Sequence, residues 1–340
     1  MTADSGWTRK RGRQAMQARF DHTLPRRAAC APLPLRTAVG IASAGRPATL
    51  QQTIRYLATT QAAPVRTIVC VPDIDDAGSL SSSPGVELIV GRRGLTCQRN
   101  AIIRAAAPDT DIVVFLDDDF VPAPDFMARM AAVFARQEDV VIATGEVLAD
   151  GILGKGLSMA EALTIIEGAG ERAELVTDVY NAYGCNMVVR LAPVLQQALT
   201  FDEELPLYGW LEDVDFSRTI ARHGRSVKVA GALGVHLGVK SGRQPGLRLG
   251  YSQVANPAYL MRKGTMTGAR AIAQISRNML ANLRGVLIAD RSVDRLGRLR
   301  GNIIAMRDLL AGNASPSRVL EFSSSSTKPL PTTPANRSAS

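Results

Sequence analysis

The sequence predicts an α/β fold in which a mostly parallel sheet is flanked by helices and followed by a basic helical C-terminal extension. Short β-branched runs alternate with segments of helical spacing over residues 37–150, which is typical of βαβ units. Three consecutive aspartates, Asp117, Asp118 and Asp119, directly follow a strongly apolar run. Beyond Gly246, apolar residues recur every three or four positions with arginines between them, as in amphipathic helices.

The first part of the chain predicts strands and helices in alternation. Gly45-Arg46-Pro47 separates the first strand from the first helix, and Pro122 and Pro124 mark the start of a later helix. The expected strands are 38–43, 65–71, 86–90, 111–116 and 140–146, and the expected helices are 50–58, 97–107 and 124–136. Because the carboxyl ends of parallel strands meet at one edge, a site is expected there.

The rest of the chain is less regular. The expected elements are a helix over 157–166, a strand over 185–189, a helix over 212–223 and a strand over 226–230. We therefore expect four regions, which are a flexible basic segment (1–36), an α/β domain divided at residue 150 (37–240), a basic amphipathic helical extension (241–320) and a disordered tail (321–340).

The composition is that of a globular chain with a full core, because 46% of the 340 residues are hydrophobic and 21% are charged. No apolar run reaches the roughly 18 uncharged residues that a membrane-spanning helix needs. The four cysteines lack metal-site spacing and the density of a disulfide framework, so disulfides are not expected.

The charge is divided unevenly along the chain, whose formal net charge is +9. Residues 37–239 carry 16 basic and 25 acidic side chains, whereas residues 240–308 carry 13 and 3. A nucleic-acid partner is not expected, because the core is acidic and aromatic residues make up only 5% of the chain. The pattern favours an enzyme core that binds a cation, joined to an arm that meets polyanions.

Asp117, Asp118 and Asp119 place three carboxylates at the end of one strand. Like charges this close repel, and a divalent cation such as Mg²⁺ or Mn²⁺ removes the repulsion while also binding substrate phosphates. The structural alternative is an acidic turn that caps the helix starting near Pro124. Three carboxylates in a row favour the cation site.

A second acidic cluster, Glu212, Asp213 and Asp215, opens a predicted helix. Carboxylates in a first helical turn stabilise the helix through its dipole, so a purely structural role stays open, above all for Asp215. Gly209 and Trp210 would give an apolar approach to these carboxylates, which suits one of them as a general base for a hydroxyl group.

Of the three histidines, His236 is the candidate ligand, because it lies shortly after a predicted strand in the segment GVHLG. A neutral imidazole is a common metal ligand, although a lone histidine more often has a structural role. His223 ends a predicted helix, where a cation is stabilising, and His22 lies in the N-terminal segment.

Taken in order, these segments resemble the family-2 glycosyltransferases of the GT-A fold over residues 37–240. The motifs that carry the resemblance are IASAGRP (41–47) with Asp73, GLTCQRN (94–100), FLDDD (115–119), FDEEL (201–205) and EDVDF (212–216) with His236. FLDDD resembles the DXD motif of the family. The resemblance implies a nucleotide-sugar-binding half over 37–150 and an acceptor half over 151–240.

The resemblance also implies roles for single residues. The residues that would contact a nucleotide-diphosphate sugar donor are Ser43, Arg46, Asp73, Arg99, Asp117 and Asp118. Asp119, with Asp117 and His236, would hold Mn²⁺ or Mg²⁺ on the diphosphate. Asp213 would be the catalytic base, with Glu212 as the second candidate. The implied reaction is inverting, so that the acceptor hydroxyl attacks the anomeric carbon while the nucleoside diphosphate leaves.

Two departures from the family pattern bear on the substrates. Ala44 and Gly45 stand where many members have an aromatic residue and Asn, which leaves the nucleotide unassigned. No Gln-x-x-Arg-Trp segment follows His236, so one sugar per encounter is expected rather than processive synthesis. The acceptor would be a glycan or a lipid-linked oligosaccharide in exopolysaccharide or cell-surface glycan synthesis.

The basic segment 240–308 has two interpretations of equal weight, which are reversible attachment to an anionic membrane surface and a solvated helical face. The expected location is the cytoplasm, with peripheral attachment to the inner face of the cell membrane.

Other functions stay open as alternatives. A haloacid-dehalogenase-like phosphatase also has Asp-x-Asp at a strand end, but its nucleophile belongs on the first strand of the domain. Another metal-dependent phosphoryl- or nucleotidyl-transfer enzyme is also an alternative, but the Gly-rich loop with Arg and Lys that a nucleotidyltransferase has after its first strand is missing from this sequence. A basic protein that binds nucleic acid or membrane without catalysis is the remaining alternative. Mn²⁺-dependent binding of a nucleotide-diphosphate sugar would separate these classes.

Overall fold

The structure is a computed structural model, and it describes residues 35–60, 66–82, 85–170, 172–173, 175–240, 245–288 and 293–322. The predictions for the N-terminal segment 1–36 and for the tail 321–340 fall almost entirely outside these residues. The boundary placed between a domain over 37–240 and an extension over 241–320 stays a prediction.

Strands and helices alternate along the described chain. The strands are β1 (Thr37–Ala42), β2 (Arg66–Val71), β3 (Val86–Val90), β4 (Ile112–Asp117), β5 (Phe120–Pro122), β6 (Val140–Asp150), β7 (Val176–Asp178), β8 (Asn186–Arg190) and β9 (Arg225–His236). The helices are α1 (Pro47–Thr60), α2 (Leu95–Ala106), α3 (Phe126–Arg136), α4 (Met159–Gly168), α5 (Leu191–Gln196), α6 (Glu212–Ile220), α7 (Gly246–Lys263), α8 (Gly268–Leu287) and α9 (Arg295–Leu310). Short 3₁₀ helices are η1 (Ile74–Ser82), η2 (Gly151–Leu153) and η3 (Pro316–Leu320).

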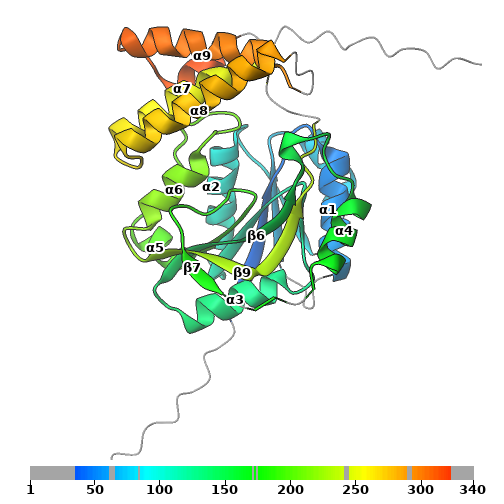
Figure 1. The fold of residues 1–340 in the computed structure, drawn as a ribbon. Coiled ribbons are helices and arrows are strands. Elements are labelled where there is room, and N and C mark those ends of the chain that lie inside the picture. The colour runs from blue at the N-terminus through cyan, green and yellow to red at the C-terminus, as the bar shows by residue number, and fades with distance from the viewer. Residues whose placement is uncertain are drawn as a thin grey trace, which may run out of the picture. The chain divides into compact units, whose positions relative to one another are not determined.

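The strands form one mixed sheet with the order β3-β2-β1-β4-β8-β6-β9-β5, and β7 pairs with β9. β3, β2, β1 and β4 are parallel, β8 is antiparallel to both of its neighbours, and β6 is parallel to β9. Helices lie on both faces of the sheet, with α1 and α4 on one side and α2, α5 and α6 on the other (Figure 1). The predicted α/β fold with flanking helices is confirmed.

The side chains of β4 alternate between two hydrophobic cores, because successive residues of a strand point to opposite faces. Ile112, Val114 and Leu116 belong to the core formed with α1 and α3, whereas Val113 and Phe115 belong to the core formed with α2 and α6. All five side chains are buried. Burial on both faces explains the continuous apolar run in the sequence and fixes the strand end that follows it.

β9 is longer than the sequence indicates, because the strand predicted to end at residue 230 continues to His236. Gly231 and Gly234 favour a strand end, but the last residues of β9 stay extended by pairing with β5, with Phe120 opposite His236. Gly234 is required there, since a Cβ atom would lie 2.2 Å from the ring of Phe120. The strand predicted from sequence thus ends six residues too early, and His236 is a strand residue.

α7, α8 and α9 confirm the helices predicted beyond Gly246 and lie together at the top of Figure 1. Buried amides join them, because the amide nitrogen of Asn282 donates to Oε1 of Gln253 at 2.7 Å and to Oδ1 of Asn302 at 2.8 Å. Such a buried polar network favours one register of the helices over others. Among the described residues, no helix is long and apolar enough to cross a membrane.

Replacement of Gly301 by alanine is expected to lower the free energy of unfolding by about 1–3 kcal/mol, although alanine favours helices more than glycine does. α9 approaches α7 so closely here that a Cβ atom on Gly301 would lie 2.2 Å from the main-chain oxygen of Leu247. Urea denaturation measures the change. Gly268→Ala is the matched control, because its Cβ would lie 3.5 Å from the sulfur of Met261. Equal stability of the two variants would contradict the close approach.

Candidate active site

Four strands end together at one edge of the sheet. Asp117 ends β4, and parallel pairing places it opposite Ala42 at the end of β1. His236 ends β9 and lies opposite Asp150 at the end of β6. Asp119 lies in the turn between β4 and β5, where its main-chain oxygen accepts a hydrogen bond from Leu237 at 2.9 Å. The carboxyl ends of β1, β4, β6 and β9 therefore carry the candidate site.

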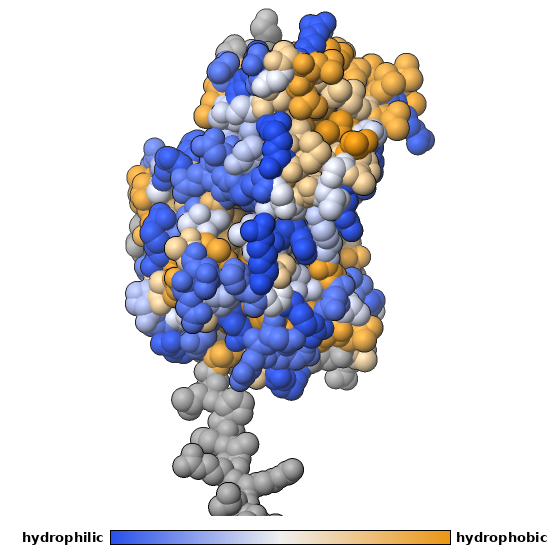
Figure 2. Space-filling view, turned by 90° about the vertical axis from the view of Figure 1, so that its left-hand side faces the viewer, coloured by the Kyte–Doolittle hydropathy of each residue, from blue (hydrophilic) through white to orange (hydrophobic). Residues whose placement is uncertain are grey.

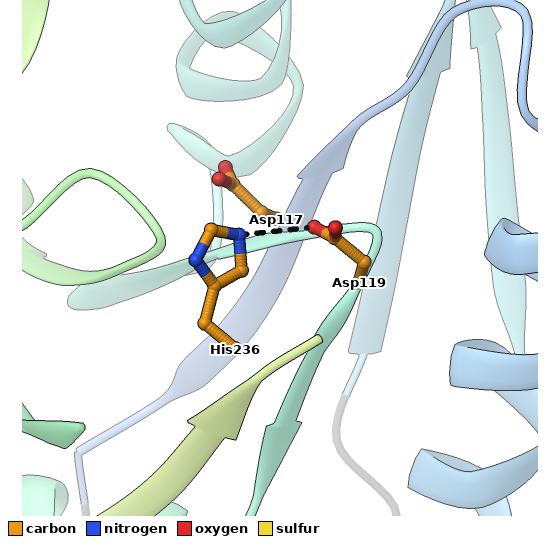
Figure 3. Close-up of side chains that lie close together, drawn as sticks. All are labelled: Asp117, Asp119 and His236. Carbon is orange, nitrogen blue, oxygen red and sulfur yellow. Dashed lines mark ion pairs between the residues drawn. The ribbon is translucent and has the colours of Figure 1, made fainter. Parts of the chain in front are cut away.

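Asp117, Asp119 and His236 form a cluster in which one ligand atom of each residue lies within 4.8 Å of the others (Figure 3). Nε2 of His236 is 3.3 Å from Oδ1 of Asp119. The main-chain N–H of Val239 donates to Oδ2 of Asp119 at 2.8 Å. Asp119 and His236 are buried, whereas the side chain of Asp117 is 25% exposed, so the cluster is accessible from the Asp117 side.

His236 is oriented by a residue that the sequence analysis does not single out. Nδ1 of His236 lies 2.9 Å from Oδ1 of Asp150, and the hydroxyl of Tyr183 donates to Oδ2 of Asp150 at 2.8 Å. Burial alone would lower the pKa of His236, but its hydrogen bonds to Asp119 and Asp150 outweigh burial and raise the pKa to about 10. Burial likewise opposes ionisation of Asp119, yet His236 and Arg46 hold its pKa below the usual range.

The cluster fits a hard divalent cation. Two carboxylates supply oxygen ligands, and an imidazole nitrogen is a ligand that Mn²⁺ accepts. The Asp150 carboxylate that accepts from Nδ1 of His236 would leave Nε2 for a cation, which is the usual arrangement around a metal-ligating histidine. Binding of a cation would displace the proton from Nε2 of His236, and the charge of the cation would then compensate the carboxylates of Asp117 and Asp119.

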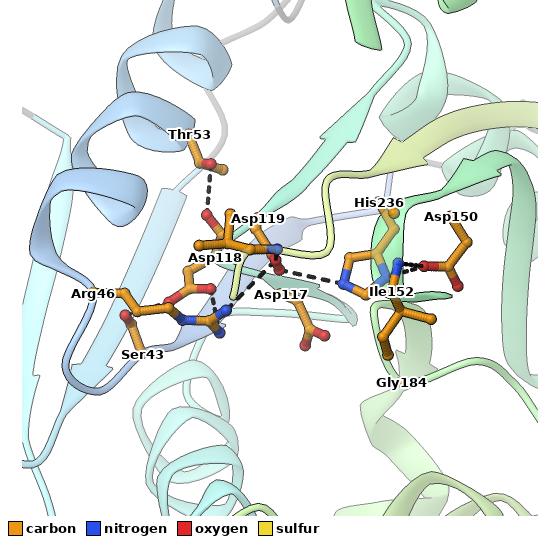
Figure 4. Close-up of polar contacts among 12 residues, drawn as sticks. Ser43, Arg46, Thr53, Asp117, Asp118, Asp119, Asp150, Ile152, Gly184 and His236 are labelled. Atoms are coloured by element: carbon orange, nitrogen blue, oxygen red, sulfur yellow. Dashed lines mark hydrogen bonds and ion pairs between the residues drawn. The ribbon is translucent and has the colours of Figure 1, made fainter. Parts of the chain in front are cut away.

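Asp118, the middle residue of the triplet, points away from the cluster. Its Oδ2 accepts a hydrogen bond from Ser43 at 2.5 Å, and its Oδ1 pairs with Arg46 at 2.6 Å. Thr53 on α1 donates to the main-chain oxygen of Asp118 at 2.6 Å (Figure 4). Burial raises the pKa of Asp118 to about 7, against the charge of Arg46. The structure thus brings Asp118 together with Ser43 and Arg46 at the loop after β1.

Asp73 and Arg99, two further residues predicted to contact the nucleotide-sugar donor, differ in exposure. Asp73 is exposed after β2, and its carboxylate accepts from the main-chain N–H of Asp75 at 3.1 Å. Arg99 is buried, and its guanidinium donates to Glu212 at 2.6 Å, to the carbonyl of Gly184 at 2.7 Å and to Asp117 at 3.4 Å. Arg99 therefore connects the cation cluster to the second acidic cluster.

Glu212 and Asp213 begin α6 and differ in accessibility. Glu212 is 4% exposed, and burial raises its pKa to about 8 against the charge of Arg99. Asp213 is half-buried, accepts from the main-chain N–H of Gly184 at 3.2 Å, and has a pKa raised mainly by burial. The preceding segment contains Leu207 and Leu211 at positive φ, a strained conformation that is enriched at functional sites.

A protein-family model described as "Glycosyltransferase like family 2" matches residues 34–236 of the chain. The chain belongs to this family. The expectation drawn from the sequence motifs is confirmed at the level of the family and of its glycosyltransferase class. No curated protein matches the chain.

Solved structures of several glycosyltransferases resemble this family-2 chain. S. aureus TarS 1-349 is 13% identical with a TM-score of 0.47, and the match covers 67% of this chain and 66% of that one. GalNAc-T7, solved with UDP, GalNAc and Mn²⁺, is 14% identical with a TM-score of 0.48, over 68% of this chain and 51% of that one. The mannosyltransferase PcManGT from Pyrobaculum calidifontis, solved with GDP-Man and Mn²⁺, is 14% identical with a TM-score of 0.48, over 84% and 85%.

Asp215 of this family-2 chain has structural contacts that its position in the sequence does not reveal. Its carboxylate pairs with Lys263 of α7 at 2.6 Å and accepts from the hydroxyl of Thr265 at 2.6 Å. The side chain of Asn256, also on α7, donates to the main-chain oxygen of Trp210 at 2.7 Å. These contacts attach α7 to the segment that carries Glu212 and Asp213.

Arg99→Met is expected to lower the free energy of unfolding by about 1–3 kcal/mol, because the buried oxygens of Glu212 and of the Gly184 carbonyl lose the guanidinium that donates to them. The double variant Arg99→Met/Glu212→Gln is expected to recover a large part of that loss. Urea denaturation of the wild type, both single variants and the double variant forms a complete cycle. Arg55→Met, at an exposed arginine of α1, is the control. Additive effects of the two substitutions would contradict the pairing.

Asp150 and Tyr183 are the residues that sequence reasoning misses at this site. The signal that could have found Asp150 is its place at the end of a strand, the same signal that identifies Asp117. No motif marks Tyr183, because its contact with Asp150 spans 33 residues and depends on the loop before β8.

Proposed function

We propose that this protein transfers one sugar from a nucleotide-diphosphate sugar to a hydroxyl group of a glycan or lipid-linked oligosaccharide, with inversion at the anomeric carbon. Exopolysaccharide or cell-surface glycan synthesis is the process we propose for it. The observation that carries the proposal is the cluster of Asp117, Asp119 and His236 at the strand ends of a family-2 chain. Mn²⁺ or Mg²⁺ held by these residues would neutralise the charge that develops on the departing diphosphate.

The loop after β1 supports a donor site beside this cluster. The side chain of Arg46 is 22% exposed and lies 2.6 Å from Asp118 and 3.5 Å from Asp119. A guanidinium in this position suits the oxygens of a diphosphate. Ser43 donates to Asp118 and so holds the loop, and Asp73 lies on the exposed edge after β2, where it would accept hydrogen bonds from the nucleoside.

Asp213 is the base in this proposal. As the acceptor oxygen bonds to the anomeric carbon, the bond from that carbon to the diphosphate oxygen breaks, and its electron pair leaves with the nucleoside diphosphate. The hydroxyl proton passes to the carboxylate of Asp213. Burial of Asp213 raises its pKa toward neutrality, which improves a carboxylate as a general base. Glu212 is the second candidate, but Arg99 engages one of its oxygens and it is more deeply buried.

A screen of nucleotide-diphosphate sugars tests the proposal. The full chain is incubated with each donor in Mn²⁺ or in EDTA, and release of the nucleoside diphosphate is measured. We expect release from one donor class, abolished by EDTA and accelerated by the correct acceptor. Absence of release from every donor, or release that EDTA does not change, would contradict the proposal.

A further inference from the structure

α8 exposes a face that combines leucine and isoleucine with arginine. Ile272, Leu280, Leu283 and Leu287 have exposed fractions of 65%, 65%, 44% and 76%. Arg270, Arg277 and Arg284 follow one another at intervals of seven residues on the same exposed side. The guanidinium of Arg270 lies 3.8 Å over the ring of Tyr180, so Arg277 and Arg284 are the two arginines directed away from the α/β part. We call these seven residues the α8 face.

The helical geometry sorts the α8 face into two adjoining strips. Leu280, Leu283 and Leu287 are spaced by three and four residues and therefore form one apolar strip. The arginines form a second strip along its edge, and the sequence of α8 contains no acidic residue. The opposite side of α8 is the one that packs in the molecule, where Ala271, Asn282 and Gly285 are buried.

Hydrophobic side chains gather over the part of the molecule formed by the C-terminal helices, whereas hydrophilic side chains cover most of the α/β part in the same view (Figure 2). Exposed apolar residues also occur on neighbouring α9, namely Leu296, Ile303 and Leu310. Exposed apolar side chains concentrated on one helix face favour an interaction site over singly scattered surface residues.

We propose that the α8 face binds the surface of a bilayer that contains anionic lipids, with α8 lying in the plane of the interface. Leucine and isoleucine side chains would enter the acyl boundary, and the stems of Arg277 and Arg284 would extend along it while their charges meet lipid phosphates. A second copy of this chain is a poorer occupant, because an antiparallel two-fold contact of α8 with its copy would bring arginines against arginines.

α8 and α7 contact the part of the chain that carries the proposed catalytic base. Ala271 at the start of α8 shares a hydrophobic cluster with Leu205 and with Val214, the neighbour of Asp213. Lys263 on α7 pairs with Asp215 at 2.6 Å. A bilayer held on α8 would therefore be attached, through packed side chains, to the helix that carries the proposed base.

Flotation of the full chain with lipid vesicles tests the inference, and no donor or acceptor is present. We expect binding to vesicles of phosphatidylcholine mixed with phosphatidylglycerol, weak binding to phosphatidylcholine alone, and weaker binding as salt is raised. Leu280→Gln/Leu283→Gln/Leu287→Gln should lower the partition coefficient at least about tenfold. Arg277→Gln/Arg284→Gln should lower it about fivefold per charge on anionic vesicles only.

Matched controls separate the face from general effects on surface or folding. Leu175→Gln/Leu195→Gln and Arg55→Gln/Arg222→Gln change exposed residues elsewhere and should bind as the wild type does. Ser276→Leu, which fills a gap in the apolar strip, should increase binding a few-fold while its urea denaturation midpoint stays at the wild-type value.

Three outcomes would overturn the inference. The first is absence of wild-type binding to anionic vesicles. The second is equal binding of the triple leucine variant and its control. The third is a triple variant that only dissociates an oligomer in light scattering, which would assign the face to self-association. Each outcome leaves the proposed sugar transfer to be judged by the donor screen alone.

Discussion

Asp213→Asn is expected to lower the rate of sugar transfer by about 10²–10⁴-fold while donor and cation binding stay at wild-type values. The amide cannot take the proton of the acceptor hydroxyl. Its oxygen can still accept from the N–H of Gly184, as Asp213 does at 3.2 Å, so the start of α6 should keep its structure. Initial rates with the donor found in the screen, together with calorimetric titration of the donor, measure the two effects separately.

The pH dependence of transfer gives this prediction a second readout. A base must be ionised, so transfer requires a pH above the pKa of Asp213 and is lost as the pH falls through that pKa. Because burial raises this pKa, the loss should begin at a higher pH than for an ordinary aspartate, whose pKa is 3.8. Transfer retained by Asp213→Asn and lost in Glu212→Gln would instead assign the base to Glu212.

Asp119→Ala is expected to weaken Mn²⁺ binding by about 100-fold or more and to abolish measurable donor binding. The carboxylate of Asp119 makes the most contacts in the cluster, because His236, Arg46 and the main-chain N–H of Val239 all lie against it. Its loss removes an anionic ligand and leaves His236 paired with Asp150 alone. Paramagnetic titration with Mn²⁺ measures the first effect, and calorimetry with the donor measures the second.

Asp118→Asn is the matched control, because it changes the adjacent carboxylate of the same triplet. Asp118 contacts Ser43 and Arg46 rather than the cluster, and its pKa of about 7 makes an uncharged amide a close substitute near neutral pH. Mn²⁺ affinity within a few-fold of the wild type is expected. Loss of Mn²⁺ in Asp118→Asn with retention in Asp119→Ala would reverse the assignment of the two aspartates.

The different partners of Asp118 and of its two neighbours show which features of the site can be predicted from the sequence. The strand that ends at Asp117 follows from an apolar run buried on both faces, and the position of the triplet at its end follows with it. Which carboxylate faces which partner depends on the turn into β5, a three-residue strand that no periodic pattern announces. Local sequence therefore predicts where the three aspartates lie but not which partner each carboxylate contacts.

The other contacts of the site that the sequence does not predict join segments that lie far apart in the chain. Asp150 meets His236 across 86 residues through the register of β6 and β9, and Asp215 meets Lys263 across 48 residues. Arg99 is expected from the motif to contact the donor, which stays a prediction, and its hydrogen bonds in this structure go to protein groups. Such partners depend on the tertiary fold, because each residue alone fits several roles.

The central claim is that Asp117, Asp119 and His236 bind one divalent cation together. Crystals soaked with Mn²⁺ and a nucleoside diphosphate, measured for anomalous scattering at the manganese edge, test it most directly. We predict one strong peak within coordination distance of both carboxylates and of Nε2 of His236, with diphosphate oxygens on its open side. A peak bound elsewhere, or ordered nucleotide without manganese at these three residues, would contradict the claim.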